Sequence, residues 1–204
     1  AEQKVKEERE INGLELALAV AILNSDRISL LWPPLFQRLQ AMLDNPRSSP
    51  RVLATAAQGL LRLGSKAMHQ PPIGSDVAAA VGKLQFLDEN KLKGLAPTLA
   101  PHLRLLVKCN LENISSQCGD DLISVVALLK KLAAFPSSAP TALDALSLLV
   151  LHRSALSPSH FGVCCEAVGE FASRAADATV GGKGVDYLYA LHLRVCCWRR
   201  QEAA

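Results

Sequence analysis

The stretch Asn24-Ser25-Asp26-Arg27-Ile28-Ser29-Leu30-Leu31-Trp32 lies between two segments that both have the apolar spacing of amphipathic helices. Before it, the apolar residues that recur along one helix face are Ile11, Leu14, Leu18 and Ile22. After it, a second helical pattern extends to about residue 43. We therefore expect two helices, over residues 1–23 and 27–43, joined by a short turn and packed as an antiparallel pair.

Four residues of this junction have side chains suited to holding the two helices together. Asn24 can end the first helix, and Ser25 or Asp26 can cap the second. Arg27 has several expected partners, namely Asp26, Glu15 or the carbonyl groups that end the first helix. Trp32 is large enough to fill the gap between the helices. We interpret the set as a structural motif that needs no ligand; its members are Asn24, Asp26, Arg27 and Trp32.

The rest of the chain repeats the pattern of apolar helical segments separated by proline-, glycine- or serine-rich loops. Further helices are expected over residues 51–68, 75–87, 89–110, 119–135, 142–152, 159–178 and 183–201. Pro33-Pro34 leaves open a second helix that restarts at Pro33, and Pro97 and Pro101 predict a bend in the fifth. Roughly nine helices in pairs of about 40 residues predict an all-α, HEAT/armadillo-like helical-hairpin solenoid. A polar connector suggests two regions, 1–110 and 111–204, although one domain is also compatible.

Composition excludes several functional classes. Hydrophobic residues make up 50% of the 204 residues and aromatic residues only 4%, so the apolar mass is mostly aliphatic and favours helix. A net charge of +3 is too small to indicate a nucleic-acid partner. The longest uninterrupted apolar run, Leu16 to Leu23, is far shorter than the about 20 residues that cross a bilayer. We expect no transmembrane segment.

No motif in the chain predicts catalysis, a cofactor or a metal. The five histidines lack ligand spacing, and the Asp120-Asp121 pair is followed by Leu122-Ile123, which does not continue an acidic magnesium motif. The six cysteines form no C-x-x-C pair. We expect the vicinal pairs to be reduced and to pack as small apolar side chains.

Two groups of residues are candidates for an interaction surface. Trp32 and Phe36 lie one helical turn apart, and form either a core contact between helices or an exposed apolar patch. Near the end of the chain, Trp198, Arg199 and Arg200 combine an aromatic ring with two cations, as in segments that lie at a membrane interface.

Three segments resemble a conserved region of the large Arf guanine-nucleotide exchange factors of the GBF/Gea/GNOM type. Leu14-Glu15-Leu16 followed by the junction resembles that family's "L-E-L … N-R-D-R-I-x-x-L-W" pattern, with Ser25 in place of its first arginine. Gly59-Leu60-Leu61-Arg62-Leu63 resembles its "G-L-L-R" helix, and residues 113–121 resemble a connector that starts "N-I-x-S". In that family the region lies downstream of the catalytic domain.

The resemblance implies a helical, non-catalytic regulatory fragment. Exchange in that family depends on a glutamate finger in a separate Sec-seven domain, and no residue here matches that motif. The implied partners are other domains of the same exchange factor, an Arf GTPase and anionic Golgi lipids. The implied location is cytoplasmic and peripheral on Golgi or endosomal membranes. The residues alone also fit a HEAT-type interaction scaffold unrelated to Arf, or an α-helical enzyme that binds a small molecule.

Overall fold

The computed structural model describes residues 2–116, 119–152, 158–174 and 178–202. These residues form helices without any β-strand, which confirms the all-α prediction. The helices are α1 (Glu2–Leu23), a 3₁₀ turn η1 (Ser25–Arg27), α2 (Ile28–Asp44), α3 (Pro50–Ala67), α4 (Pro71–Leu84), α5 (Glu89–Ser116), α6 (Gly119–Leu132), α7 (Ala139–Leu151), α8 (Pro158–Arg174) and α9 (Ala178–Glu202).

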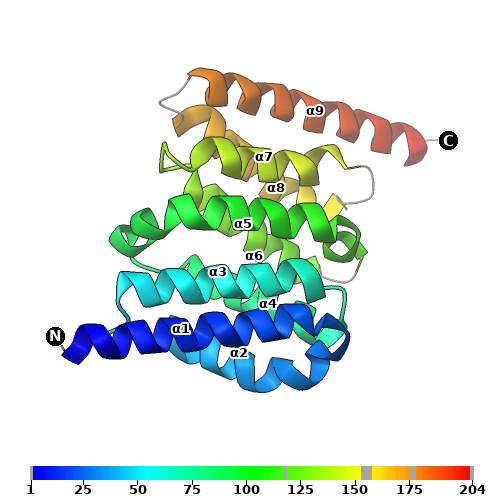
Figure 1. Ribbon diagram of the computed structural model, residues 1–204. Helices are drawn as coiled ribbons and strands as arrows, with labels where there is room; N and C mark the ends of the chain where they lie inside the picture. Colours follow the sequence, from blue (N-terminus) through cyan, green and yellow to red (C-terminus); the bar gives the residue numbers. More distant parts are fainter. Residues whose placement is uncertain (1, 117–118, 153–157, 175–177, 203–204) are drawn as a thin grey trace.

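The helices are stacked in two rows, with the chain ends at opposite ends of the stack (Figure 1). The odd row contains α1, α3, α5, α7 and α9, and each packs on the next. The even row contains α2, α4, α6 and α8, which pack on one another behind the odd row. Each of α1, α3, α5 and α7 forms one hairpin with the even helix that follows it. This is the predicted helical-hairpin solenoid.

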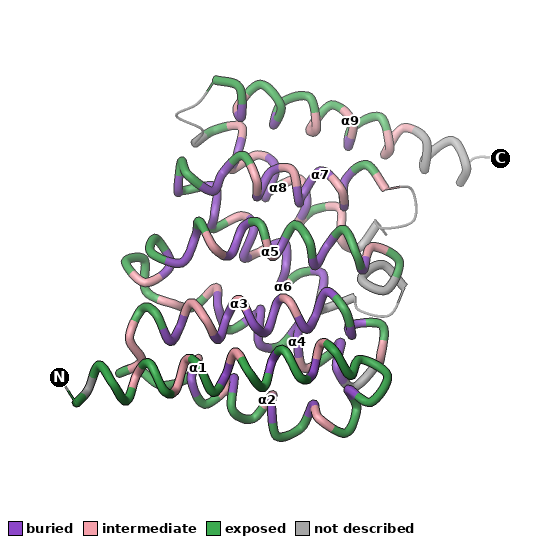
Figure 2. The backbone as a smooth tube through the Cα atoms, in the orientation of Figure 1, coloured by how far each residue is buried: buried purple, intermediate pink, exposed green. Residues whose placement is uncertain are grey.

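Aliphatic side chains fill the space between the rows as one continuous core (Figure 2). Every odd-row helix contributes at least one fully buried leucine: Leu18, Leu60, Leu103, Leu146 and Leu191. The core runs past residue 110, which lies inside α5 and not in a connector. Small aliphatic residues allow the helices to approach closely, which explains how so few aromatic residues suffice.

In both rows, ion pairs connect the first hairpin with the second and the third hairpin with the fourth. Each pair joins an acidic residue on one helix to a basic residue on its row neighbour: Glu15–Arg62 at 3.5 Å, Arg104–Asp144 at 3.9 Å, Asp44–Lys83 at 3.3 Å and Lys130–Glu166 at 3.2 Å. All eight side chains are substantially exposed, so each pair adds little to stability. Their main effect is to fix which faces of neighbouring helices meet.

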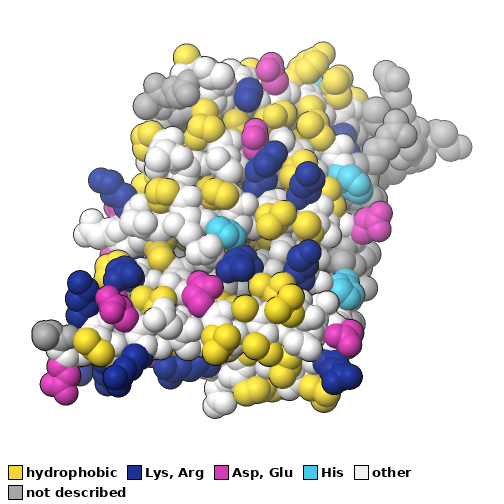
Figure 3. Space-filling view, in the orientation of Figure 1, with side chains coloured by type: hydrophobic (Ala, Val, Ile, Leu, Met, Phe, Trp, Pro, Cys, Tyr) yellow, Lys and Arg dark blue, Asp and Glu magenta, His cyan; other side chains and the backbone are white. Residues whose placement is uncertain are grey.

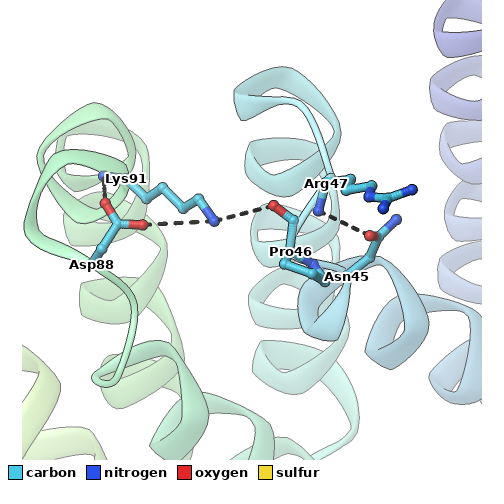
Figure 4. A network of polar contacts seen from close by, with 5 residues as sticks. All are labelled: Asn45, Pro46, Arg47, Asp88 and Lys91. Atoms are coloured by element: carbon cyan, nitrogen blue, oxygen red, sulfur yellow. Dashed lines mark hydrogen bonds and ion pairs between the residues drawn. The ribbon is translucent and has the colours of Figure 1, made fainter.

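A polar network ties the loop after α2 to the start of α5 (Figure 4). Lys91 donates to the Pro46 carbonyl oxygen at 3.5 Å and pairs with Asp88 at 3.6 Å. The Asp88 carboxylate also accepts the Lys91 backbone N–H at 2.9 Å, and so caps α5. Within the loop, the Asn45 side chain accepts the Arg47 backbone N–H at 2.9 Å. The network therefore links the loop between the first two hairpins to the start of the third.

Prolines and glycines did not interrupt the helices where the sequence predicted. Pro33 and Pro34 lie inside a continuous α2, so of the two alternatives the helix does not restart at Pro33. The carbonyl groups of Ser29 and Leu30, which these prolines leave without helical partners, belong to exposed residues and can be hydrated. The paired glycines Gly181-Gly182 lie within the first turns of α9, not before it.

Two further boundaries differ for related reasons. Helix α4 begins at Pro71 and not at Ser75, because prolines fit the first turn of a helix. Helix α5 continues through Pro97 and Pro101, both exposed, and bends instead at Asn110. The buried Asn110 side chain donates to the Leu106 carbonyl oxygen at 2.9 Å, which holds the bend.

Candidate interaction surfaces

Asn24 lies at the end of α1 and hydrogen-bonds to its last turn. Its side-chain Nδ2 and its backbone N–H both donate to the Val20 carbonyl oxygen, at 2.8 and 3.0 Å. The chain then turns through η1, where the Arg27 backbone N–H donates to the Asn24 carbonyl oxygen at 2.9 Å. These contacts are all local, which is why the sequence alone could indicate them.

Asp26 and Arg27 lie on the surface and do not clamp the helices. Neither the Asp26 side chain nor the Ser25 side chain caps η1 or α2, which corrects that expectation. Arg27 approaches Asp26 at 3.8 Å, with both side chains about three-quarters exposed. Glu15, the other expected partner, pairs with Arg62 of α3 instead. Backbone hydrogen bonds close the η1 turn, from the Arg27 N–H to the Asn24 carbonyl oxygen and from the Ile28 N–H to the Ser25 carbonyl oxygen.

Trp32 is a buried contact between the first and second hairpins. Its side chain is 3% exposed, and its Nε1–H donates to the Asp76 carboxylate of α4 at 2.8 Å. The indole stacks on the half-buried Phe36 ring, with centroids 5.1 Å apart and an angle of 16° between the planes. The partner is therefore α4 and not α1, and the indole is not an exposed patch for a membrane or protein.

The second predicted group lies outside the described side chains. Trp198, Arg199 and Arg200 belong to α9, but their side chains are among those that the structure does not describe. Earlier in α9, Val185, Tyr189 and Leu193 are exposed and recur every four residues along one face.

The outer surface of α5 carries a basic and apolar cluster that sequence analysis missed. The α5 cluster consists of His102, Arg104, Leu105 and Lys108, which line a shallow hollow of about 310 Å³ together with Pro101. Leu105 is 44% exposed. The i, i+4 spacing of Arg104 and Lys108 could have revealed this shared face.

The polar side chains of the α5 cluster differ in their interaction partners. Arg104 pairs with Asp144 at 3.9 Å, and the His102 ring nitrogen Nδ1 lies 2.8 Å from the Thr98 carbonyl oxygen. No ion pair involves Lys108 within the described part of the chain. The odd row faces the viewer in Figure 3, where lysine and arginine side chains alternate with apolar ones. Exposed cations around an exposed leucine are suited to contact a surface of anionic headgroups.

Comparison with known proteins gives two matches over most of the chain. It is 25% identical over 160 residues to the ARF guanine-nucleotide exchange factor GNOM of Arabidopsis thaliana, and 22% identical over 160 residues to the ARF guanine-nucleotide exchange factor GNL1 of the same plant. Both matches cover 78% of this chain. The chain is related to the large Arf guanine-nucleotide exchange factors. No family model matches it.

The chain also matches the human protein named Protein MON2 homolog. The identity is 33% over 107 residues, which are 52% of the chain. The chain spans 11% of the length of GNOM and of GNL1, and 6% of the MON2 homolog. The relationship predicted from the junction motif is therefore confirmed, and it concerns one segment of much longer proteins.

In this chain, the described cysteines are free thiols in contrasting surroundings. Cys109 is exposed, whereas Cys164 is fully buried in α8. Burial, reinforced by the neighbouring Cys165, raises the pKa of the Cys164 thiol to about 12. Burial also raises the pKa of Cys165. These thiols remain protonated at neutral pH, which makes them poor nucleophiles and metal ligands.

No group of three or more histidine, cysteine, aspartate or glutamate side chains among the described residues is placed to hold a metal ion. None of the described helices combines the length and apolarity required to cross a membrane.

Proposed function

We propose that this chain is a non-catalytic regulatory and membrane-recruitment segment of an Arf guanine-nucleotide exchange factor that acts in vesicle trafficking. The relationship to GNOM and GNL1 supports the exchange-factor context. The observation that carries the recruitment role is the α5 cluster, where cations surround the exposed Leu105. The site of action would be the cytoplasmic side of Golgi or endosomal membranes.

The arrangement of polar side chains favours a binding role over catalysis. The ion pairs between helices lie across the outer surfaces of neighbouring helices, with all eight side chains substantially exposed. A catalytic site instead brings titratable groups together where their pKa values are perturbed. The described pKa shifts belong to Cys164 and Cys165, and their direction keeps both thiols protonated.

The proposed partners are anionic Golgi lipids, a membrane-anchored Arf GTPase and other domains of the same exchange factor. Lysine and arginine near an anionic surface each contribute on the order of 1 kcal/mol to binding. The cluster alone would therefore bind weakly, and a second contact such as Arf would strengthen it. We also retain residues 1–110 and 111–204 as proposed regions, because the bend of α5 lies at their junction.

Flotation with liposomes tests this proposal. The chain is mixed with neutral or anionic Golgi-like vesicles, with and without membrane-anchored, GTP-loaded Arf, and the floated fraction is measured. We expect flotation with anionic vesicles that increases when Arf is present. Flotation that requires Arf would support a feedback contact, whereas no flotation in any condition would overturn the membrane role and favour an intramolecular scaffold.

Charge-reversal variants locate the contact. Arg104→Glu with Lys108→Glu should reduce the floated fraction at least about tenfold, because two attractive charges become repulsive. The matched control is Lys83→Glu with Lys130→Glu, which changes the net charge equally but on the even row. Equal losses in both variants would show that only net charge matters and would remove the α5 cluster from the proposal.

A further inference from the structure

The first hairpin presents an apolar groove at the end of the stack, on the side that faces away from α3 and α4. We call it the edge groove. Residues of α1 and α2 line it, and among the described residues these are the last helices at that end of the stack (Figure 1). Leu16, Val20 and Leu31 line the groove beside Gly13, and Arg9 and Arg38 add two positive charges at its rim. The groove has a volume of about 600 Å³.

Helix α1 is apolar on two sides, which distinguishes it from a helix that caps a solenoid. Leu14 and Leu18 are buried against the rest of the molecule, whereas Leu16 is 68% and Val20 is 45% exposed on the groove side. A terminal repeat that caps a solenoid has a polar outer face. The groove side of α1 instead resembles the inner faces of the stack.

The interior of the stack shows how such a face is filled. The side chain of Leu18 from α1 packs over Gly59 of α3, so closely that a Cβ at Gly59 would lie 2.5 Å from a Leu18 methyl carbon. Gly64 likewise receives Val77 of α4 and Leu106 of α5. Neighbouring helices of the stack thus place branched aliphatic side chains over helical glycines.

Gly13 of α1 is a helical glycine like Gly59 and Gly64, but no described side chain of another helix packs over it. A Cβ built at Gly13 meets no atom within 4 Å, and the residue lies in the wall of the edge groove. Glycine in a helix interior costs up to about 1 kcal/mol relative to alanine. This glycine therefore weakens α1 without serving any contact among the described residues.

The charged side chains at the rim of the edge groove indicate which charges a bound partner would carry beside its apolar face. Arg38 is engaged by Glu10, at 2.6 Å. Arg9 makes no ion pair in the described part of the chain, and it lies one helical turn from Gly13. If a partner helix placed an aliphatic side chain over Gly13, an acidic residue one helical turn away on that helix could pair with Arg9.

We propose that the edge groove binds one further amphipathic α-helix, laid along α1 as the next member of the odd row. This helix seats a leucine-sized side chain over Gly13 and places a carboxylate near Arg9. The inference is independent of the membrane proposal, because it concerns α1 and α2 at the end of the stack and not α5.

Peptide binding to the intact chain tests it. The probe is a fluorescein-labelled synthetic helix of about 20 residues, with leucines at the i, i+4, i+7 spacing and glutamates beside them. We expect saturable binding by fluorescence anisotropy. Gly13→Leu should weaken it at least about tenfold without lowering the melting temperature, since the added side chain meets open space. Unchanged binding to Gly13→Leu, or no saturable binding, would overturn the proposal.

Two controls make the result specific. Gly94→Leu, at an exposed α5 glycine that also has no atom within 4 Å, should leave peptide binding unchanged. Arg9→Glu should weaken the glutamate peptide and favour a lysine version of it. Sedimentation that shows self-association removed by Gly13→Leu and unaffected by the peptide would identify a second copy as the occupant and would contradict the proposal.

Discussion

Trp32 illustrates at the residue scale how one side chain can join two hairpins. Its ring lies against Phe36 of the same helix, and its Nε1–H reaches Asp76 of α4. The contact therefore combines a buried apolar surface with a hydrogen bond to a charged acceptor. The apolar contact and the hydrogen bond each contribute to the free energy of unfolding, and two substitutions of Trp32 can separate the two contributions.

Trp32→Ala should lower the free energy of unfolding by about 3–5 kcal/mol, because it leaves a large cavity. Trp32→Phe keeps most of the ring and loses the hydrogen bond to Asp76, so we expect a smaller loss of about 1–3 kcal/mol. Urea denaturation measures both. Arg27→Ala is the control from the same junction, and its exposed side chain predicts a change within about 0.5 kcal/mol. A larger loss for Arg27→Ala than for Trp32→Phe would contradict this account.

Cys164 should make stability depend on alkaline pH. Its folded pKa of about 12 lies above the ordinary value of 9.0, so the folded state keeps a proton that the unfolded state loses. The contribution is fully present below pH 9 and is lost as the pH rises through about 12. Its slope approaches about 1.4 kcal/mol per pH unit. Urea titrations of the wild type and Cys164→Ala at pH 8 and 10 measure it. Equal pH slopes in the two proteins would contradict the prediction.

The residues of the junction also show what a sequence can predict. Asn24 was predicted because its acceptor, Val20, is one turn away in the same helix. The pairing of Trp32 with Asp76 spans 44 positions, and it depends on how the second hairpin packs against the first. No local sequence pattern specifies that register. Residue spacing can predict a helix, but the partner of Trp32 on another helix is known only from the structure.

At the element scale, helix packing depends on glycines that permit close contact. Gly59→Ala should lower the free energy of unfolding by about 1–3 kcal/mol, although alanine favours helix, because its Cβ would overlap the buried Leu18. Gly94→Ala, where space is open, should raise it by up to about 1 kcal/mol. Thermal and urea unfolding of the two variants provide the comparison. A gain in stability for Gly59→Ala would show that Leu18 moves aside.

Helix number and type were predictable, whereas several ends and bends were not. Apolar periodicity and loop composition gave nine helices, and nine lie in the described residues. Proline positions misled because exposed carbonyl groups can be hydrated, so α2 and α5 continue through their prolines. The bend of α5 depends on buried Asn110, which also approaches carbonyl groups of α3. That contact is tertiary, and sequence spacing does not indicate it.

At the scale of the whole molecule, the two rows give the chain distinct surfaces. The odd row carries the α5 cluster, and the end of the stack carries the edge groove. The even row contributes paired lysines such as Lys83 and Lys130. The surfaces are separated in space, so lipid contact and helix binding can occur together. The sequence predicted the stack but not these surfaces, because each depends on which helices become neighbours.

The most direct test of the recruitment role is lysine footprinting on membranes. The chain is acetylated briefly with and without anionic vesicles carrying GTP-loaded Arf, and the modification rate of each lysine is measured by mass spectrometry. We predict that vesicles slow the modification of Lys108 and leave Lys83 and Lys130 unchanged. Equal rates at Lys108 with and without vesicles, or protection confined to the even-row lysines, would contradict the proposed membrane-facing surface.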